Sequence, residues 1–283
     1  MAVLAVADEP RWPVELTFTM EKNLPLVQVS IGDVHNLTFI LDSAAAGCVI
    51  DRDRSAEIGL AASEPAMSSG SGGLQPGEVI TGIHLNVGGL EIRPERCFTF
   101  DMKALKFRGS VAGILGMPLF RKYVVEIDYP SFHVRVFQPE GYRAPSNAEV
   151  FPVRITTGPV IRGSIRVHGR EPIHADFQLD TGSAHVLTLC TAFVDRLKLV
   201  EAAEEVTDGS TLGIGGNAVD KRGRIEEVRI GRFALRNPVV HFSRQTTGTL
   251  SSEQYYSANL GGEFLKRYKV TFDLPGSRLF LED

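Results

Sequence analysis

The sequence contains an internal repeat, which limits the folds open to the chain more than any other feature. Three pairs of segments align in the same order: LPLVQVSIG (24–32) with GPVIRGSIRVHG (158–169), FILDSAAAGCVI (39–50) with FQLDTGSAHVLT (177–188), and GILGMPLFRKYVVEIDYPSFHV (113–134) with ANLGGEFLKRYKVTFDLPGSRL (258–279). The length changes lie between the aligned blocks. Three ordered matches predict that the chain is a duplicated unit of about 140 residues.

Most of each repeat has the pattern of β-strands. Short runs rich in Val, Ile, Phe and Thr are broken by Gly, Pro, Asn and Asp about every 8–12 residues, a spacing typical of all-β folds. Helical patterns are confined to four short windows, at 52–60, 117–123, 190–199 and 262–268. The expected fold class is therefore mostly β, with two duplicated lobes and short helices.

The repeat and the composition divide the chain into four parts. Residues 138–149, rich in proline, glycine and polar residues, form the expected linker. The linker separates an N-terminal lobe, residues 14–137, from a C-terminal lobe, residues 150–283. Residues 1–13 form an N-terminal tail.

The tail leaves the compartment of the protein open. Ala5-Val6-Ala7 before Asp8 resembles the cleavage site of an export signal, although the apolar stretch before it is short and has no basic residue. The tail is either the remnant of a trimmed signal, which implies an exported or periplasmic protein, or a frayed end of a cytoplasmic one. No run approaches the about 20 apolar residues of a membrane-spanning helix, so no membrane span is expected.

Charge and residue usage argue against several other classes of protein. Lys and Arg number 30 against 34 Asp and Glu, for a net charge of −4, which disfavours binding to nucleic acid or an anionic membrane. Three cysteines form no disulfide framework, and the seven histidines show no zinc-binding spacing. We therefore expect neither a metal nor another cofactor.

The repeat places two aspartates in equivalent positions. Asp42 and Asp180 each end an apolar strand, and each is followed by a small hydroxyl residue, Ser43 or Thr181, and two more small residues. If the halves pack about a pseudo-twofold axis, the carboxyl groups face each other. Two carboxyl groups about 3 Å apart share one proton. The charged one then accepts a proton from water while the other protonates a carbonyl, which is acid–base hydrolysis of an amide.

These motifs resemble those of the two-lobed aspartic peptidases, and more specifically of their bacterial retropepsin-like branch. Asp-Thr-Gly-Ser at 180–183 matches the motif of that family, and Asp-Ser-Ala-Ala at 42–45 matches it in part. The apolar-apolar-Gly element that follows in each lobe is present at 114–116, whereas Asn-Leu-Gly at 259–261 departs from it at the first position. The resemblance spans nearly the whole chain.

The resemblance implies a role for each matching residue. Asp42 and Asp180 would be the catalytic pair. Ser43 and Thr181 would form hydrogen bonds to the backbone of the opposite lobe and hold the turns rigid. Ser183 would donate a hydrogen bond to the outer oxygen of Asp180.

Ala44 is the main departure from the family, which has glycine there, as this chain does at Gly182. Glycine lets a substrate backbone approach closely, so the methyl group allows two interpretations. With a negative φ the alanine is tolerated and the site is active. Otherwise the turn is distorted, and the protein is a weak or inactive member of the fold that binds a peptide or a protein partner.

Each half also has a Gly-rich segment between its motif and the downstream element, at 68–78 and 208–223. In the resembled family this region forms a β-hairpin flap that closes over the peptide. The flap residues expected to contact substrate are Gly72, Gly73, Gly213, Ile214, Gly215 and Gly216. An ordinary flexible hairpin is the alternative for either segment.

The resemblance as a whole implies an aspartic endopeptidase. Its substrate would be an extended polypeptide, held as an added strand beneath the flaps. Because one chain contains both half-sites, a monomer is expected to suffice. His185, just after the second motif, is interpreted as a packed or surface histidine rather than as a catalyst.

Overall fold

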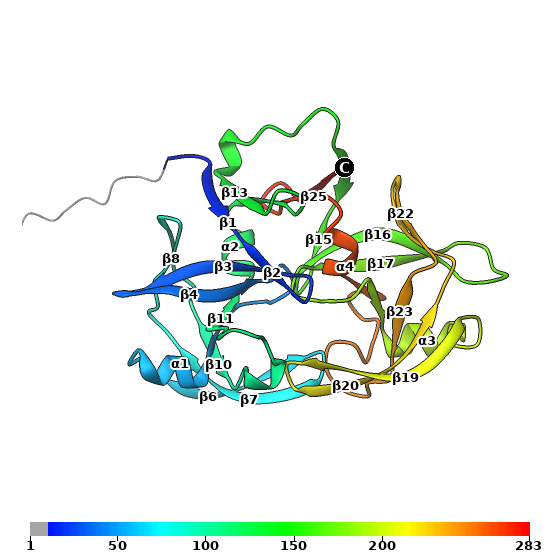
Figure 1. The fold of residues 1–283 in the computed structure, drawn as a ribbon, viewed down its shortest axis with the longest axis horizontal. Coiled ribbons are helices and arrows are strands. Elements are labelled where there is room, and N and C mark those ends of the chain that lie inside the picture. The colour runs from blue at the N-terminus through cyan, green and yellow to red at the C-terminus, as the bar shows by residue number, and fades with distance from the viewer. Residues whose placement is uncertain (1–10) are drawn as a thin grey trace, which may run out of the picture.

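A computed structural model describes residues 11–283 (Figure 1). It contains two ten-stranded sheets, one in each repeat, and a six-stranded sheet to which both repeats contribute. In Figure 1 the first repeat lies on the left, the second on the right, and the six-stranded sheet above them. The expected cleavage site at Ala5-Val6-Ala7 lies outside the described residues.

The sheet of the first repeat has the order β6-β7-β10-β5-β11-β4-β3-β8-β9, with β2 paired to β3. Its strands are β2 (Thr19–Glu21), β3 (Leu24–Ile31), β4 (Val34–Leu41), β5 (Cys48–Asp51), β6 (Glu64–Gly70), β7 (Gly73–Ile80), β8 (Leu85–Val87), β9 (Leu90–Ile92), β10 (Cys97–Phe100) and β11 (Gly113–Leu115). Strand β11 is parallel to β4 and antiparallel to β5. It thus lies between the two strands that flank the first aspartate motif.

The sheet of the second repeat has the order β19-β20-β23-β18-β24-β17-β16-β21-β22, with β15 paired to β16. Its strands are β15 (Arg154–Ile155), β16 (Pro159–Arg166), β17 (Ile173–Asp180), β18 (Leu187–Leu189), β19 (Glu204–Gly213), β20 (Gly216–Arg224), β21 (Glu227–Ile230), β22 (Phe233–Arg236), β23 (Val239–Ser243) and β24 (Ala258–Gly261). Each strand has a counterpart at the same place in the first sheet. The predicted duplication is therefore confirmed at the level of topology.

The third sheet joins the repeats, with the strand order β1-β13-β12-β25-β26-β14. Its strands are β1 (Val14–Thr17), β12 (Val124–Asp128), β13 (His133–Phe137), β14 (Glu149–Pro152), β25 (Lys269–Asp273) and β26 (Arg278–Glu282). Each repeat supplies three strands, and the antiparallel pair β12–β25 crosses the boundary. The sequence pattern predicts strands over all six of these segments but not the sheet that they share.

Four short α-helices and two 3₁₀ turns complete the fold. They are α1 (Arg52–Glu57), η1 (Lys103–Leu105), α2 (Met117–Phe120), η2 (Pro139–Gly141), α3 (Thr191–Leu197) and α4 (Gly262–Leu265). The α-helices lie within the four predicted windows but are shorter; α1, for example, is followed by Gly59, whose φ is +71°. Within residues 11–283, none of the helices has the length and apolar character to cross a membrane.

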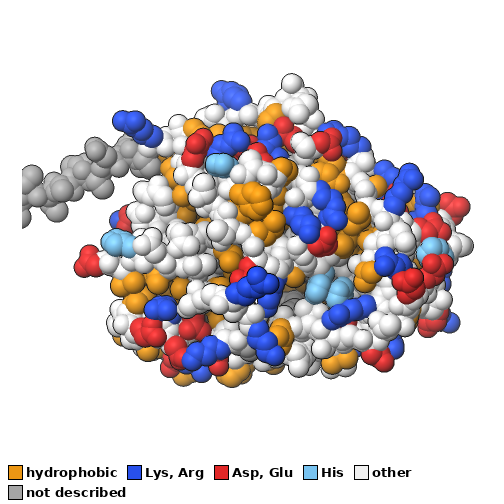
Figure 2. Space-filling model, viewed as in Figure 1, with side chains coloured by type: hydrophobic (Ala, Val, Ile, Leu, Met, Phe, Trp, Pro, Cys, Tyr) orange, Lys and Arg blue, Asp and Glu red, His pale blue; other side chains and the backbone are white. Residues whose placement is uncertain are grey.

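One large hydrophobic core extends through both repeats. Phe120 and Phe272, which belong to different repeats, pack edge-to-face with ring centroids 5.2 Å apart. Both are fully buried. The halves are therefore held together by apolar packing as well as by the shared sheet. On the face shown in Figure 2, basic and acidic side chains are interspersed rather than gathered by sign.

Candidate active site

The two aspartate motifs form tight turns that meet between the repeats. Asp42 follows the last residue of β4, and Asp180 is the last residue of β17. Each strand is paired in parallel with an inner strand, β11 or β24, so its end is fixed within the sheet. The apolar strand then gives way to three small residues, which allow the chain to turn sharply.

Reciprocal hydrogen bonds lock the turns together. The Ser43 hydroxyl donates to the Leu179 carbonyl at 2.9 Å, and the Thr181 hydroxyl donates to the Leu41 carbonyl at 2.6 Å. Each hydroxyl oxygen also accepts the backbone N–H of the other residue, at 2.9 and 3.1 Å. Both side chains are fully buried. Buried bonds in both directions keep the turns in a fixed relative position.

The two carboxyl groups lie close enough across this junction for each to shift the pKa of the other. Asp42 Oδ1 accepts the backbone N–H groups of Ala44 and Ala45, at 2.8 and 2.9 Å. Asp180 Oδ1 accepts the N–H of Gly182 at 2.8 Å. The turns therefore place the acids in contact and fix one oxygen of each with backbone donors.

Their surroundings shift the pKa values of both acids. Each residue keeps part of its surface exposed, but the carboxyl groups themselves are largely removed from solvent. Burial raises the pKa of Asp42 well above its usual range, and the charge of Asp180 raises it further. Burial also raises the pKa of Asp180, but hydrogen bonds from Asn259 and Gly182 oppose that rise. Two close acids with unequal surroundings retain one proton between them over a range of pH.

Ala44 and Gly182 occupy equivalent positions with different amounts of space. Ala44 has no positive φ, so its alanine imposes no strain of that kind on the turn. A Cβ added at Gly182 would collide with the carboxyl group of Asp42. The φ of Ala44 therefore does not distort the first turn. In the second turn, residue 182 must be glycine for the two turns to approach closely.

The hydrogen bond expected from the Ser183 hydroxyl to Asp180 is not formed in the described structure. Asn259 takes that place: its Nδ2 donates to Asp180 Oδ2 at 2.6 Å. Asn259 lies in β24, the strand parallel to β17. Its departure from the apolar-apolar-Gly element is the one sign of this residue in the sequence, and that departure does not predict a contact with the aspartate.

The Gly-rich segments form two β-hairpins, β6–β7 and β19–β20, which reach toward each other along the lower edge of Figure 1. Their tips touch through the backbone. The N–H of Gly72 donates to the Ile214 carbonyl at 2.9 Å. A Cβ added at Gly72 would collide with Gly216, and one added at Gly215 would lie 2.6 Å from the carbonyl carbon of Gly73. Glycine at these positions therefore allows the tips to pack directly on each other.

Ile214, at the tip of the second hairpin, reaches across to the first repeat. It packs against an apolar cluster that we call the tip cluster, which consists of Leu24, Leu26, Ile40, Val49, Phe100, Met102 and Ile114. A small cavity of about 60 Å³ lies between this tip and the residues around Phe100. The hairpins thus cover the tip cluster with their ends in contact.

A polar network ties the second hairpin to β23 and to the loop that follows Asp180. His241 Nδ1 lies 3.0 Å from Asp220 Oδ2, and the Thr211 hydroxyl donates to the same oxygen at 2.9 Å. His185 stacks on His241 at 3.7 Å, and burial lowers its pKa to about 4. His185 is therefore a neutral, packed histidine near pH 7. Within residues 11–283, no three His, Cys, Asp or Glu side chains are placed to hold a metal ion.

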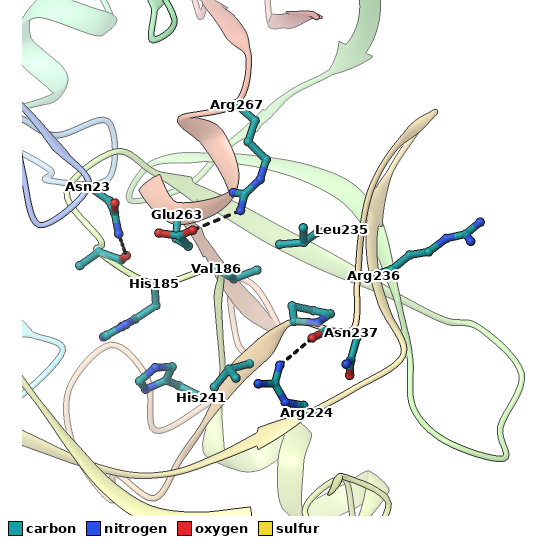
Figure 3. A pocket seen from close by; sticks show the side chains of 13 residues that line it. Asn23, His185, Val186, Arg224, Leu235, Arg236, Asn237, His241, Glu263 and Arg267 are labelled. Carbon is teal, nitrogen blue, oxygen red and sulfur yellow. Dashed lines mark hydrogen bonds and ion pairs between the residues drawn. The ribbon is translucent and has the colours of Figure 1, made fainter. Parts of the chain in front are cut away.

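A cavity of about 430 Å³ opens beside this network, next to the residues that follow the Asp180 turn (Figure 3). His185 lines it on one side. Arg267 pairs with Glu263 at 3.1 Å, and Arg224 donates to the Asn237 carbonyl at 3.0 Å. Its charged lining is thus largely occupied by internal contacts. The volume is sufficient for a side chain of a bound polypeptide.

Two duplicated β-lobes that each present one aspartate to the other, through interlocked turns, define the architecture of an aspartic protease. The model of a protein family described as aspartyl protease matches the chain twice, over residues 27–119 and 163–254. The matches cover more than half of the sequence, with one in each repeat. The chain belongs to the aspartyl protease family. No curated protein matches the sequence.

Proposed function

We propose that the protein is an aspartic endopeptidase that hydrolyses peptide bonds with Asp42, Asp180 and an activated water. The observation that carries this proposal is the contact between the two carboxyl groups at the junction of the interlocked turns. The buried hydroxyls of Ser43 and Thr181 support it, because they hold the acids in place before substrate arrives.

The chemistry follows from the shared proton. A water bound between the acids loses a proton to the ionised carboxylate as its oxygen attacks the peptide carbonyl carbon. The protonated acid gives its proton to the carbonyl oxygen. The amide is then hydrolysed without a covalent intermediate, and neither a metal nor another cofactor enters the reaction.

The substrate in this proposal is an extended polypeptide. It would lie as an added strand between the carboxyl groups and the hairpins, which act as flaps. Gly72, Gly73, Gly213, Ile214, Gly215 and Gly216 would then contact or admit the peptide. Since the tips touch each other in the structure, the flaps must part to admit substrate. The Gly-Ile-Gly-Gly tip at 213–216 supports a retropepsin-like assignment.

A single chain would form the complete enzyme. We place its lobes at residues 14–137 and 150–283, joined by the linker 138–149, so that each lobe contributes one aspartate. The mixed charges of the face in Figure 2 and the net charge of −4 favour a polypeptide over a nucleic acid as substrate.

Peptide binding without cleavage is the second candidate function, and Ala44 is the observation that favours it. By the pseudo-twofold relation to Gly182, the Ala44 methyl is expected to lie toward Asp180. If that methyl excludes the water or the substrate carbonyl, the cleft would hold a peptide without cutting it.

One experiment distinguishes cleavage of the peptide from binding without cleavage. Wild type and Ala44→Gly are incubated with a denatured protein from acidic to neutral pH, and fragments and bound peptides are both measured. The endopeptidase proposal predicts internal cleavage by wild type that Asp180→Asn abolishes and that glycine changes only a few-fold. Cleavage by the glycine variant alone, or binding without cleavage by both proteins, would favour the second function.

A further inference from the structure

One side chain distinguishes the surroundings of the two aspartates. Asn259 lies in β24, beside the strand that ends in Asp180, and only 8% of its surface is exposed. Its Nδ2 donates to Asp180 Oδ2 at 2.6 Å, while Asp180 Oδ1 accepts the N–H of Gly182 at 2.8 Å. Each oxygen of this carboxyl group thus has its own amide donor.

The equivalent position in the first repeat is apolar. Ile114 lies at that place in β11 and packs within the tip cluster. It offers no donor to Asp42. Within residues 11–283, the amide donors to Asp42 are the N–H groups of Ala44 and Ala45, and both bind Oδ1. The Oδ2 atom of Asp42 receives no amide hydrogen bond comparable to the one from Asn259.

The amide of Asn259 is also only half satisfied. Its Oδ1 is buried without a hydrogen-bond partner. A buried unpaired carbonyl is unfavourable, and an isoleucine like Ile114 would avoid this cost. The bond to Asp180 is therefore the interaction that explains an amide at this position.

We propose that Asn259 is a positioning residue that holds Asp180 as the ionised member of the pair and leaves the shared proton on Asp42. A hydrogen bond to a charged acceptor is roughly twice as strong as one between neutral groups, so the amide favours the negative charge on Asp180. The proposal deepens the endopeptidase function and rests on it for the catalytic roles.

The groups around Asp180 agree with this assignment. Burial raises the pKa of Asp180, and the bond from Asn259 is the strongest influence that opposes the rise. The pKa of Asp42 is raised well above its usual range. The charge of Asp180 also acts on the phenols of Tyr129 and Tyr256, which burial keeps neutral by raising their pKa values.

With the charge on Asp180 and the proton on Asp42, each acid has a defined role in the reaction. The water oxygen bonds to the carbonyl carbon, its proton passes to Asp180, and Asp42 gives its proton to the carbonyl oxygen to form a gem-diol. When the C–N bond breaks, Asp180 gives its proton to the leaving nitrogen. A gem-diol hydroxyl returns a proton to Asp42, so both acids end in their starting states.

Carbon-13 NMR of aspartate carboxyl groups tests the assignment without turnover. Asp42→Asn and Asp180→Asn identify the two resonances. At a pH where the pair holds one proton, wild type should show a carboxylate shift at Asp180 and a carboxylic acid shift at Asp42. In Asn259→Ile, which copies the first repeat, the two shifts should move toward each other.

The matched control moves the amide to the other repeat. In the double variant Ile114→Asn/Asn259→Ile, the carboxylate shift should move to Asp42. A charge on Asp42 in wild type, or resonances unchanged by Asn259→Ile in a folded protein, would overturn the proposal. If Asn259→Ile fails to fold, the assigned wild-type resonances still show which acid is ionised, and a charge on Asp42 would overturn the proposal.

The pH profile of kcat/KM provides the catalytic readout. Without the Asn259 donor, Asp180 is protonated more easily, so the acidic limb should move to higher pH by about one to two units. The basic limb should stay in place, since it reports loss of the proton from Asp42. If wild type cleaves nothing, the endopeptidase function fails, while the NMR result still decides the role of Asn259.

Discussion

The two active-site turns are chemically unequal at the level of single residues, although the repeat makes them equivalent in the chain. Asp180 has a side-chain donor, Asn259, whereas in the described part of the chain, residues 11–283, the amide donors to Asp42 are backbone N–H groups. One turn keeps its glycine at 182, and the other has a methyl group at Ala44. A duplicated framework thus holds two acids in environments that give them different proton affinities.

Gly182→Ala should abolish most activity while the protein remains folded. The added methyl would collide with the carboxyl group of Asp42, which must move away from Asp180. A displacement near 1 Å at the reacting groups costs about 100-fold in rate, so kcat/KM should fall by at least that much. Circular dichroism checks the fold. The matched control is Ala44→Gly, which should change kcat/KM only a few-fold. If both substitutions change kcat/KM equally, position 182 has as much room for a methyl group as position 44, contrary to the structure.

Asp42→Asn should stabilise the protein more at neutral than at acidic pH. Because the pKa of Asp42 is raised on folding, its protonated form favours the folded state at low pH. That contribution is lost as pH rises through the folded pKa, and asparagine does not titrate. The difference in Tm between variant and wild type should therefore grow from about pH 4 to pH 8. Each kcal/mol of difference in the free energy of unfolding corresponds to roughly 2–4 °C in Tm. A difference that stays constant or shrinks would contradict the direction of the shift.

The sequence predicted the positions of the acids better than their hydrogen bonds. Asp42 and Asp180 could be found because each motif is a local pattern and occurs twice. The sequence pattern predicts a hydrogen bond from the Ser183 hydroxyl to Asp180, which is not formed in the described structure, and it does not reveal the donor Asn259. Which side chain reaches the carboxyl group depends on the packing of β24 beside β17, a contact between residues 79 positions apart.

Among the elements, the two hairpins combine exposed strands with constrained tips. Met67 and Leu74, in β6 and β7, are about 60% exposed (61% and 59%), yet the tips between the strands touch across the repeats. Few buried contacts along a hairpin allow it to move as a unit. The tip contacts would then be the ones that open when a peptide enters.

A disulfide between the tips should switch the activity off. A Cβ built at Gly213 lies 3.3 Å from the Cβ of Ser71, close to the spacing of about 3.5–4.5 Å in disulfides. In Ser71→Cys/Gly213→Cys the oxidised flaps cannot part, so cleavage of a polypeptide should be lost, and a reductant should restore it. The natural cysteines are buried and free.

The single-cysteine variants serve as controls for that experiment, since they cannot form the link. Whatever activity each one has, it should be the same in both redox states. If the oxidised double variant, with its disulfide verified by mass, still cleaves at the wild-type rate, then parting of the tips is not required for substrate entry.

The sequence located the helices and hairpins because their signals are short-range. Helical windows fell on all four α-helices, and Gly-rich segments fell on both hairpins. The predicted windows extend beyond the C-terminal ends of the helices. A residue in the left-handed region can end a helix early, as Lys198 does after α3. Contact between the hairpin tips could not be read from the sequence, because it depends on how the repeats face each other.

At the scale of the whole molecule, the six-stranded sheet makes the two repeats one body. Strands β12 and β25 are almost entirely buried and pair across the repeat boundary, with Ile127 opposite Val270. The repeat predicted two equivalent units, but pairing between them is a non-local choice that no local pattern encodes. A sheet shared in this way fixes the relation between the lobes and hence between their aspartates.

A complete site in one chain predicts that activity does not depend on assembly. The rate of cleavage per chain should stay constant when the protein is diluted from micromolar to nanomolar concentration. Sedimentation at the same concentrations would report the mass of the active species. A rate per chain that falls on dilution, together with dissociation of a dimer, would contradict a monomeric enzyme.

The activity of two variants, Asp42→Asn and Asp180→Asn, tests hydrolysis by the aspartate pair most directly. A single asparagine cannot share the proton, so each change alone should abolish cleavage of a denatured protein across the acidic to neutral range. Both side chains are similar in size to aspartate, and circular dichroism should show a native fold. Both variants should therefore be folded and inactive. Near wild-type turnover by either variant would contradict hydrolysis by the aspartate pair.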